Sequence, residues 1–267
     1  MVFLSFDTEE FDVPYEHDQS FDVMNVGMEI SRRGTLRILE ILNRNQIKAT
    51  FFCTTNFASN APDVFQAILD AGHEVASHGC CHWNPKPEDA ILSKGLLETL
   101  SGKKVFGYRQ PRMFPTDAQA LAACGYLYNA SLNPTFIPGR YTHLSTSRLP
   151  FYENGILQIP SSVTPVLRIP LFWYALHVFP LWLYKSFCRR ILRHDKYFNT
   201  YFHPWEFTSL QENKDWTLPL FIRSTSGENM CSRLQRLIDD LKSQGESFGT
   251  YRQYLDMFPI KGDIRDE

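Results

Sequence analysis

The sequence predicts an α/β fold in which helices cover a parallel sheet. Short apolar runs alternate with longer segments whose apolar residues recur at helical spacing, and polar residues directly follow several of the apolar runs. Repeated strand-then-helix units form parallel sheets, because the helix returns the chain to the edge where the next strand begins. Closure of the sheet into a barrel does not follow from this alternation.

The elements can be assigned in order along the chain. The first strand is predicted at residues 2–6, and a helix capped by Ser31 is predicted to run to Asn45. Pro62 and Gly72 are typical of the start and the stop of the next helix. Further strands are predicted at 48–53, 73–77, 105–108, 126–130, 156–159, 197–202 and 248–251, and further helices within 88–100, over 116–124 and over 233–243. No repeat or linker interrupts this order, so one domain over residues 1–267 is expected.

Composition excludes several classes of protein. Hydrophobic residues make up 43% and charged residues 21% of the 267 positions, which provides a sizeable core and excludes wholesale disorder. The net charge of -2 leaves no basic footprint, so nucleic acid is not expected as the main partner. The six cysteines include no C-x-x-C pair, which is typical of reduced thiols. The first residues have no basic region and resemble a strand, so we expect a cytoplasmic location, with the membrane periphery as the alternative.

One apolar stretch, residues 169–187, needs separate treatment. It is uncharged between Arg168 and Lys185, but Pro170, His177 and Pro180 interrupt it. A membrane-spanning helix needs roughly 20 apolar residues, so the stretch is too short and too broken to span. We expect a buried helix, with a membrane-contacting surface or a cover for a lipid-linked substrate as the alternative. The sequence does not predict the oligomeric state.

Two of the polar clusters contain metal-ligand types. Asp7 and Glu9 follow the first strand and are two residues apart, so both side chains can face one pocket. His78 and His82 follow the third strand at a spacing that lets both imidazoles reach one cation. Taken singly, each cluster has an alternative interpretation. Asp7 and Glu9 could form a solvated acidic turn, and the spacing of His78 and His82 could be accidental.

Two further clusters contain groups that could orient a carboxylate or protonate a leaving group. Arg109 follows the fourth strand and could hold a carboxylate ionised, or it could be a surface arginine before the turn-setting Pro111. His203 follows the predicted strand at 197–202 and could protonate a leaving amine, or it could simply end the strand. Functional groups in parallel α/β folds collect beyond the carboxyl ends of strands, and the four clusters together supply the groups that metal-assisted hydrolysis needs.

The ordered motifs resemble the polysaccharide deacetylase family, which is chitooligosaccharide deacetylase-like and also known as carbohydrate esterase family four. The family's opening motif stands as Ser5-Phe6-Asp7-Thr8-Glu9, its two-histidine motif as His78-Gly79-Cys80-Cys81-His82 and its Arg-x-Pro as Arg109-Gln110-Pro111. His203-Pro204-Trp205-Glu206 resembles the closing motif of a bacterial exopolysaccharide-associated branch. Thr8 separates two acids that are adjacent in common members, and Gly79 and Met113 stand where the family usually has Ser or Thr and glycine. The resemblance implies an irregular (β/α)7 barrel.

The resemblance also implies an activity and a role for each residue. We expect a metal-dependent hydrolase that removes N-acetyl groups from a carbohydrate, with Zn²⁺ as the first choice of metal and Co, Ni, Mn or Fe as alternatives. Backbone N–H groups of residues 110–113 are expected to bind the oxyanion. The predicted metal ligands are Glu9, His78 and His82; the catalytic residues are Asp7 as base, His203 as acid and Arg109 as orienter of Asp7; and the supporting residues are Pro111, Trp205 and Glu206.

Two rival functions share these residues. One is an allantoinase-like amidohydrolase that opens a cyclic amide on the same fold. The other is a non-catalytic glycan-binding relative, although mere binding does not require an acid and a base together.

Overall fold

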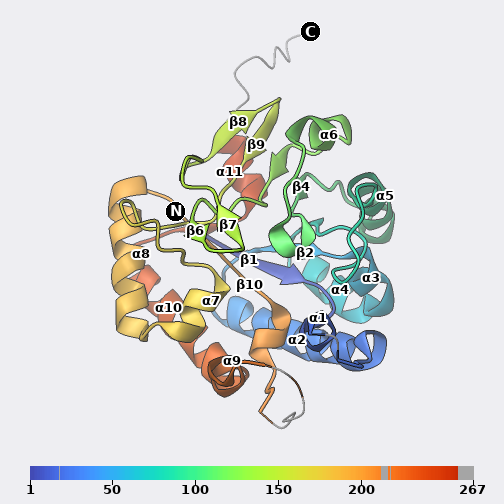
Figure 1. Cartoon of the computed structure of the whole chain (residues 1–267), viewed down its shortest axis with the longest axis horizontal. Helices are drawn as coiled ribbons and strands as arrows, with labels where there is room; N and C mark the ends of the chain where they lie inside the picture. The colour runs from blue at the N-terminus through green and yellow to red at the C-terminus, as the bar shows by residue number, and fades with distance from the viewer. Residues whose placement is uncertain (18, 212–215, 217, 258–267) are drawn as a thin grey trace.

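A curled, mainly parallel sheet forms the centre of the protein, and helices surround it (Figure 1). The computed structural model describes residues 1–17, 19–211, 216 and 218–257. The strands lie in the order β10-β1-β2-β3-β4-β5-β9-β8, and among the described strands of this sheet only β8 runs antiparallel to its neighbour. The short β11 pairs with the start of β1. The strands are β1 (Val2–Thr8), β2 (Thr50–Cys53), β3 (Glu74–Ser77), β4 (Gly107–Tyr108), β5 (Tyr128–Asn129), β8 (Phe151–Glu153), β9 (Ile156–Gln158), β10 (Phe198–Phe202) and β11 (Phe248–Gly249).

Hydrogen bonds just beyond β9 connect the two ends of the curled sheet. The backbone N–H of Ser162 donates to the carbonyl oxygen of Asn199 in β10 at 2.8 Å. In return, the backbone N–H of Asn199 donates to the Ser162 hydroxyl at 2.9 Å. Seven parallel strands therefore form an irregular barrel whose closing seam is a short segment rather than a paired strand, which confirms the predicted fold class.

The helices follow the strands as the sequence predicts, and several additional short elements occur. The longer helices are α2 (Met28–Arg44), α4 (Pro62–Asp70), α5 (Asp89–Ser101), α8 (Leu181–Asp195) and α10 (Glu228–Ser243). The shorter elements are α1 (Val13–Glu16), η1 (Val23–Gly27), α3 (Thr55–Asn60), η2 (Pro111–Met113), α6 (Ala118–Ala123), α7 (Trp173–Val178), η3 (Pro204–Phe207), α9 (Leu220–Thr225), α11 (Tyr251–Met257) and the hairpin β6 (Phe136–Ile137) and β7 (Tyr141–Thr142).

The start of α2 differs from the prediction. Ser31 lies inside the helix and is buried, so it is not the N-cap. Asp22 instead accepts a hydrogen bond from the backbone N–H of Asn25 and caps the π-helical turn η1, which leads directly into α2. The prediction of Ser31 as the cap was wrong because the apolar face of the helix begins earlier, at Met28 and Ile30.

The apolar stretch at 169–187 forms the short helix α7 and the first part of α8 instead of one buried helix. The helices α7 and α8 meet at Phe179 and Pro180, where proline cannot continue the hydrogen-bonding of α7. Leu176 and Tyr184 are buried against the core, whereas Trp182 is 71% exposed. Among the described residues, no helix is long and apolar enough to cross a membrane.

The alternation of β1 directs its side chains to two different environments. Val2, Leu4 and Phe6 pack into the large apolar cluster beneath the helices, whereas Phe3 packs into a second cluster with Phe52. Because side chains alternate along a strand, Asp7 lies on the same side as Phe3, in the interior of the barrel. The strand thus carries a carboxylate inward at its carboxyl end.

Helix α2 sits directly against the segment that follows β10. An atom placed as a Cβ on Gly34 would lie 1.8 Å from the carbonyl oxygen of Pro204, so only glycine fits. The Thr208 hydroxyl donates to the carbonyl oxygen of Ile30 at 2.9 Å, and Arg37 donates to the carbonyl oxygen of Phe207 at 3.2 Å. The helix therefore fixes the position of the segment that begins with His203.

We predict that Gly34→Ala lowers the free energy of unfolding by roughly 2 kcal/mol or more, because the methyl group must displace backbone. The matched control is Gly95→Ala in α5, where a Cβ meets nothing within 4 Å and stability should rise by about 0.5–1 kcal/mol. Urea unfolding of both variants measures the difference. Equal stability of the two variants would contradict the close packing of α2 on Pro204.

Candidate active site

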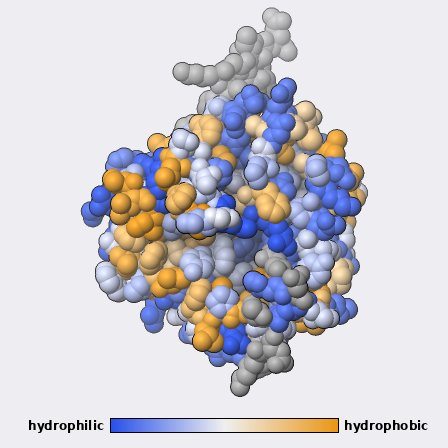
Figure 2. Space-filling model, viewed as in Figure 1, coloured by the Kyte–Doolittle hydropathy of each residue, from blue (hydrophilic) through white to orange (hydrophobic). Residues whose placement is uncertain are grey.

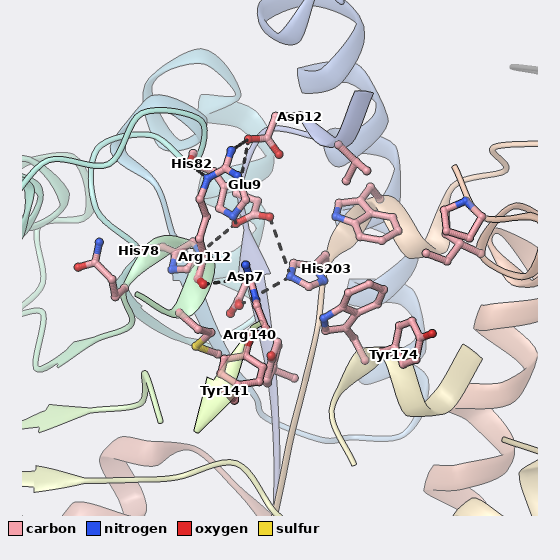
Figure 3. A pocket seen from close by; sticks show the side chains of 18 of the residues that line it. Asp7, Glu9, Asp12, His78, His82, Arg112, Arg140, Tyr141, Tyr174 and His203 are labelled. Carbon is pink, nitrogen blue, oxygen red and sulfur yellow. Dashed lines mark hydrogen bonds and ion pairs between the residues drawn. The ribbon is translucent and has the colours of Figure 1, made fainter. Parts of the chain in front are cut away.

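Three of the four polar clusters predicted from the sequence meet in one pocket at the carboxyl ends of the strands (Figure 3), and Arg109 of the fourth cluster contacts Asp7 without lining the pocket. Asp7 lies at the end of β1, and His78 and His203 directly follow β3 and β10. The cavity has a volume of about 340 Å³, and Gln110, Arg112, Tyr141 and Trp173 also contribute to its wall. Of the predicted site residues, the pocket is lined by Asp7, Glu9, His78, His82, His203 and Trp205, whereas Arg109, Pro111 and Glu206 do not line it.

Glu9 and the two histidines form a compact group of buried ligand types. The Nε2 atom of His78 lies 2.9 Å from Oε2 of Glu9, and Nε2 of His82 lies 3.5 Å from the same oxygen. One ligand atom from each of the three residues lies within 4.8 Å of the other two. Ligands bound to a single cation at about 2 Å are separated by similar distances.

The partners of the histidines fix which ring nitrogen carries the proton. The Nδ1 atom of His78 lies 2.8 Å from the carbonyl oxygen of Arg109, which can only accept a hydrogen bond. The Nδ1 atom of His82 lies 2.8 Å from a carboxylate oxygen of Asp12. Both Nδ1 atoms therefore donate, which leaves the lone pairs of both Nε2 atoms facing Glu9. Metal-bound histidines are commonly oriented in this way, by a hydrogen bond from the ring nitrogen that does not bind the metal.

These three groups fit a cation. Burial lowers the pKa of His78 to about 3, so its imidazole is neutral at pH 7. A neutral Nε2 with its lone pair turned toward a carboxylate oxygen at 2.9 Å brings two acceptors together without a proton between them. A positive ion between the three atoms removes this repulsion, and two imidazoles with one carboxylate form a donor set that suits Zn²⁺ and related divalent metals.

Asp7 forms a buried ion pair with Arg109. Burial by itself would raise the pKa of Asp7, but the Arg109 guanidinium, with smaller contributions from His78 and His203, lowers it below the usual value. Nη1 of Arg109 contacts Oδ1 of Asp7, and Nη2 donates to Ser5 and Tyr251 at 3.0 and 3.1 Å. The Asp7 carboxylate is thus held ionised, with Oδ2 on the side of His203.

His203 lies between the carboxylates and a second, deeper chain of hydrogen bonds. Its Nε2 atom lies 4.0 Å from both Oδ2 of Asp7 and Oε1 of Glu9, and its Nδ1 lies 3.0 Å from Oε1 of Glu206. The second oxygen of Glu206 lies 3.0 Å from Nε2 of His177, which is fully buried. Burial would raise the pKa of Glu206, but hydrogen bonds from His177 and His203 lower it. Glu206 therefore accepts from Nδ1 of His203 and turns Nε2 of that ring toward the pocket.

Sequence analysis missed two residues that orient the site. The Asp12 carboxylate accepts hydrogen bonds from Nδ1 of His82 and, at 3.2 Å, from Nη2 of Arg112. In the sequence, Asp12 is one of several acidic residues close together, and no pattern distinguishes it as a site residue. The sequence presents His177 only as an interruption of the apolar stretch. A histidine in an otherwise apolar helix needs a polar partner, and this need is the signal that could have identified it.

Three details of the site concern the predicted oxyanion donors and the predicted supporting residues. The backbone N–H groups of Gln110 and Met113 are already bonded, to the Ser131 hydroxyl at 2.8 Å and the Gln110 carbonyl at 3.0 Å, so they do not face an oxyanion. Trp205 is buried and stacks on His203 at 5.3 Å between ring centroids, so it forms a wall of the pocket. Gly79 adopts φ +73° with Pro111 against it, which explains glycine at this position and gives Pro111 a supporting role.

Two protein families match separate parts of the chain. Residues 16–114 match the polysaccharide deacetylase family, and residues 130–256 match a domain of unknown function, DUF3473. This first match covers less than half of the chain and shows that residues 16–114 are similar to the polysaccharide deacetylase family. No comparison tests the exopolysaccharide-associated branch, which stays a prediction.

Two curated relatives have related descriptions. The peptidoglycan deacetylase-like protein FGM2 of Gibberella zeae is 35% identical over 120 residues, which cover 41% of this chain and 36% of that protein. The peptidoglycan deacetylase of Helicobacter pylori is 26% identical over 187 residues, which cover 64% of each chain. This chain therefore spans less than two thirds of the length of either relative.

Solved structures share the fold at low identity. A candidate polysaccharide deacetylase from Mycobacterium smegmatis superposes with a TM-score of 0.67 and 19% identity, covering 96% of this chain and 88% of that one. PuuE allantoinase superposes with a TM-score of 0.64 and 17% identity, covering 97% and 91%. Because a polysaccharide deacetylase and an allantoinase share this fold, the fold alone does not identify the substrate.

We predict that Arg109→Met lowers the free energy of unfolding by about 3–5 kcal/mol, because it leaves the buried Asp7 carboxylate unpaired. The double variant Asp7→Asn/Arg109→Met should be more stable than the single variant. Arg32→Met is the matched control: Arg32 pairs with Asp63 at the surface, and its loss should cost less than about 1 kcal/mol. Chemical denaturation measures all three. A single variant as stable as the control would show that the buried pair is not what stabilises this region.

Proposed function

We propose that the protein is a metal-dependent deacetylase that hydrolyses the N-acetyl group of a poly- or oligosaccharide. One observation carries the proposal: three buried ligand atoms converge beside an ionised aspartate, and an oriented imidazole lies across from them. Mere glycan binding does not require this combination, which favours the enzyme over the non-catalytic alternative. The names of the curated relatives support an N-deacetylase.

A divalent metal held by Glu9, His78 and His82 would supply Lewis-acid polarisation of the amide carbonyl and a lowered pKa for water. We propose Zn²⁺ as the metal, because two imidazoles and one carboxylate are common among its ligands, with Co, Ni, Mn and Fe as alternatives for the same donors. The oriented Nδ1–H groups of the two histidines keep their Nε2 atoms turned toward the metal position.

Asp7 and His203 divide the proton transfers of the reaction between them. Asp7 accepts a proton from the attacking water through Oδ2, since Oδ1 is held by Arg109. The water oxygen bonds to the acetyl carbon, and the carbon–nitrogen bond breaks. His203 gives its Nε2 proton to the departing sugar amine, so acetate and a free amine are the products. Glu206 stabilises the imidazolium form of His203 through Nδ1.

The deacetylase proposal is tested by acetate release from N-acetylated oligosaccharides. Asp7→Asn should lower the kcat of the folded, metal-loaded protein by at least roughly 100-fold, because the base is lost. The substitution also leaves Arg109 without its carboxylate, so the stability of the variant is measured alongside its activity. The double variant His78→Ala/His82→Ala should lose metal and activity together, and a chelator should inactivate the wild-type enzyme until divalent metal is restored. The matched control is Asp63→Asn, which changes a surface carboxylate 64% exposed.

Two outcomes would contradict this proposal. Undiminished acetate release by Asp7→Asn would remove the assigned base. Ring opening of a cyclic ureide or imide, with no acetate released from any saccharide, would assign the same site to the rival amidohydrolase reaction.

His177 provides a separate prediction, because its Nε2 contacts Glu206, the group that orients the acid, while its Nδ1 contacts Thr225. His177→Phe removes the hydrogen bond to Glu206 while keeping an aromatic ring, and it should lower kcat about tenfold or more with KM and metal content unchanged. His194→Phe is the control, since His194 lies on α8 with its side chain 63% exposed. If His177→Phe loses metal and stability while the remaining metal-loaded enzyme keeps its wild-type kcat, the residue is structural and does not position His203.

A further inference from the structure

An apolar groove lies beside the proposed active site. Its volume is about 430 Å³, and it is formed by the hairpin β6–β7, the segment before α7 and α7 itself. All of its lining residues fall in the part of the chain that matches the domain of unknown function. The apolar side chains that line it include Ile137, Phe172, Trp173, Ala175, Val178 and Phe179.

The groove adjoins the active-site pocket. Tyr141, Trp173 and Tyr174 line both cavities, together with Arg140. The ring of Trp173 packs edge-on against His203, with 5.3 Å between the ring centroids. A molecule whose reacting amide lies next to His203 would therefore reach the groove by extending past Trp173.

The charge along this path is unevenly distributed. Within the described chain, Arg140 is the only charged residue that lines the groove, and it stands where the groove joins the pocket. Its guanidinium lies 5.6 Å from the Tyr141 ring, and Nη2 donates to the carbonyl oxygen of Arg112 at 3.1 Å. A held guanidinium at this junction suits an anionic group, whereas the groove beyond it suits hydrocarbon.

The surface around the groove is apolar as well. Tyr174 and Val178 of α7 are each 45% exposed, and Phe136 beside Ile137 is 54% exposed. Figure 2 shows hydrophobic surface on the side of the molecule that carries α7 and α8, next to a hydrophilic hollow near the centre. Exposed apolar patches that continue into a polar cavity are typical of ligand-binding surfaces.

We propose that the groove binds the hydrocarbon chain of a lipid-linked saccharide, with its anionic linker at Arg140 and its N-acetyl sugar at Asp7 and His203. The placement of the sugar rests on the proposed deacetylase function, whereas the binding of the chain does not. The substrate would then be a glycolipid in which a phosphate or similar anion joins sugar and chain. Each methylene buried in full strengthens binding about fourfold. In a groove open on one side, about twofold per methylene is expected.

The experiment compares methyl and octyl N-acetyl-β-glucosaminide, both below the concentration at which the octyl compound forms micelles. Calorimetric titration of the metal-loaded protein measures binding and needs no turnover. We expect the octyl compound to bind about 100-fold more tightly, from seven added methylenes at about twofold each. In Val178→Asp this gain should fall to less than about fivefold, while affinity for the methyl compound stays the same. Ile91→Asp on α5 is the matched control, because Ile91 is 59% exposed and lies outside the groove, and it should keep the full gain.

The linker is tested with the corresponding octyl phosphodiester of N-acetylglucosamine. Arg140→Gln should weaken binding of the phosphodiester about tenfold and leave the uncharged octyl glycoside unaffected, because only the former carries an anion. Equal weakening of both compounds would show that Arg140 acts by shaping the groove and would overturn its assignment to the linker.

The outcomes separate the two proposals. Equal affinity of wild-type protein for the methyl and octyl compounds would overturn the chain site whether or not acetate is released. The chain site would also be overturned if Val178→Asp still bound the octyl compound about 100-fold more tightly than the methyl compound. A third contradicting result would be that the wild-type protein binds sugar-free phosphatidylcholine vesicles and Val178→Asp does not, because the apolar surface would then contact membrane. Tight octyl binding with no acetate released from any saccharide would preserve the chain site and refute the deacetylase.

Discussion

Three buried acceptor atoms that face one another are the constraint on which the site depends. Glu9, His78 and His82 come from two strand ends, and the proton positions on the two imidazoles are set by Arg109 and Asp12. Without a cation the group is electrostatically unfavourable, because acceptors meet in a buried place. The surrounding structure holds them there: the parallel register of β1, β2 and β3 brings the strand ends to one edge.

A buried ion pair and a buried chain of hydrogen bonds give the two sides of the pocket different roles. Arg109 holds Asp7 as a carboxylate from within the barrel, where the alternation of β1 directs it. On the other side, Glu206 and His177 orient His203 from beneath the helical layer, and α2 packs on the same segment through Gly34. The base and the acid are thus oriented by different parts of the core, Asp7 by Arg109 and His203 by Glu206.

Much of this site could be predicted from the sequence, because it follows from strand periodicity and motif order. The strand ends carry Asp7, His78, Arg109 and His203, and each lies where a polar residue follows a short apolar run. What could not be predicted depends on contacts between distant segments. His177 meets Glu206 across 29 residues, and the turn η1 moves the start of α2 ahead of Ser31. The break between α7 and α8 at Pro180 also exposes part of residues 169–187, whose apolar composition predicts a buried helix.

The most direct test of the central claim is a crystal structure of the zinc-loaded protein, with anomalous scattering recorded at the zinc edge. We predict a single strong peak about 2.0–2.2 Å from a carboxylate oxygen of Glu9 and from Nε2 of both His78 and His82. Zinc bound elsewhere, for example at Cys80 and Cys81, with Nε2 of His78 still against Glu9, would contradict the account.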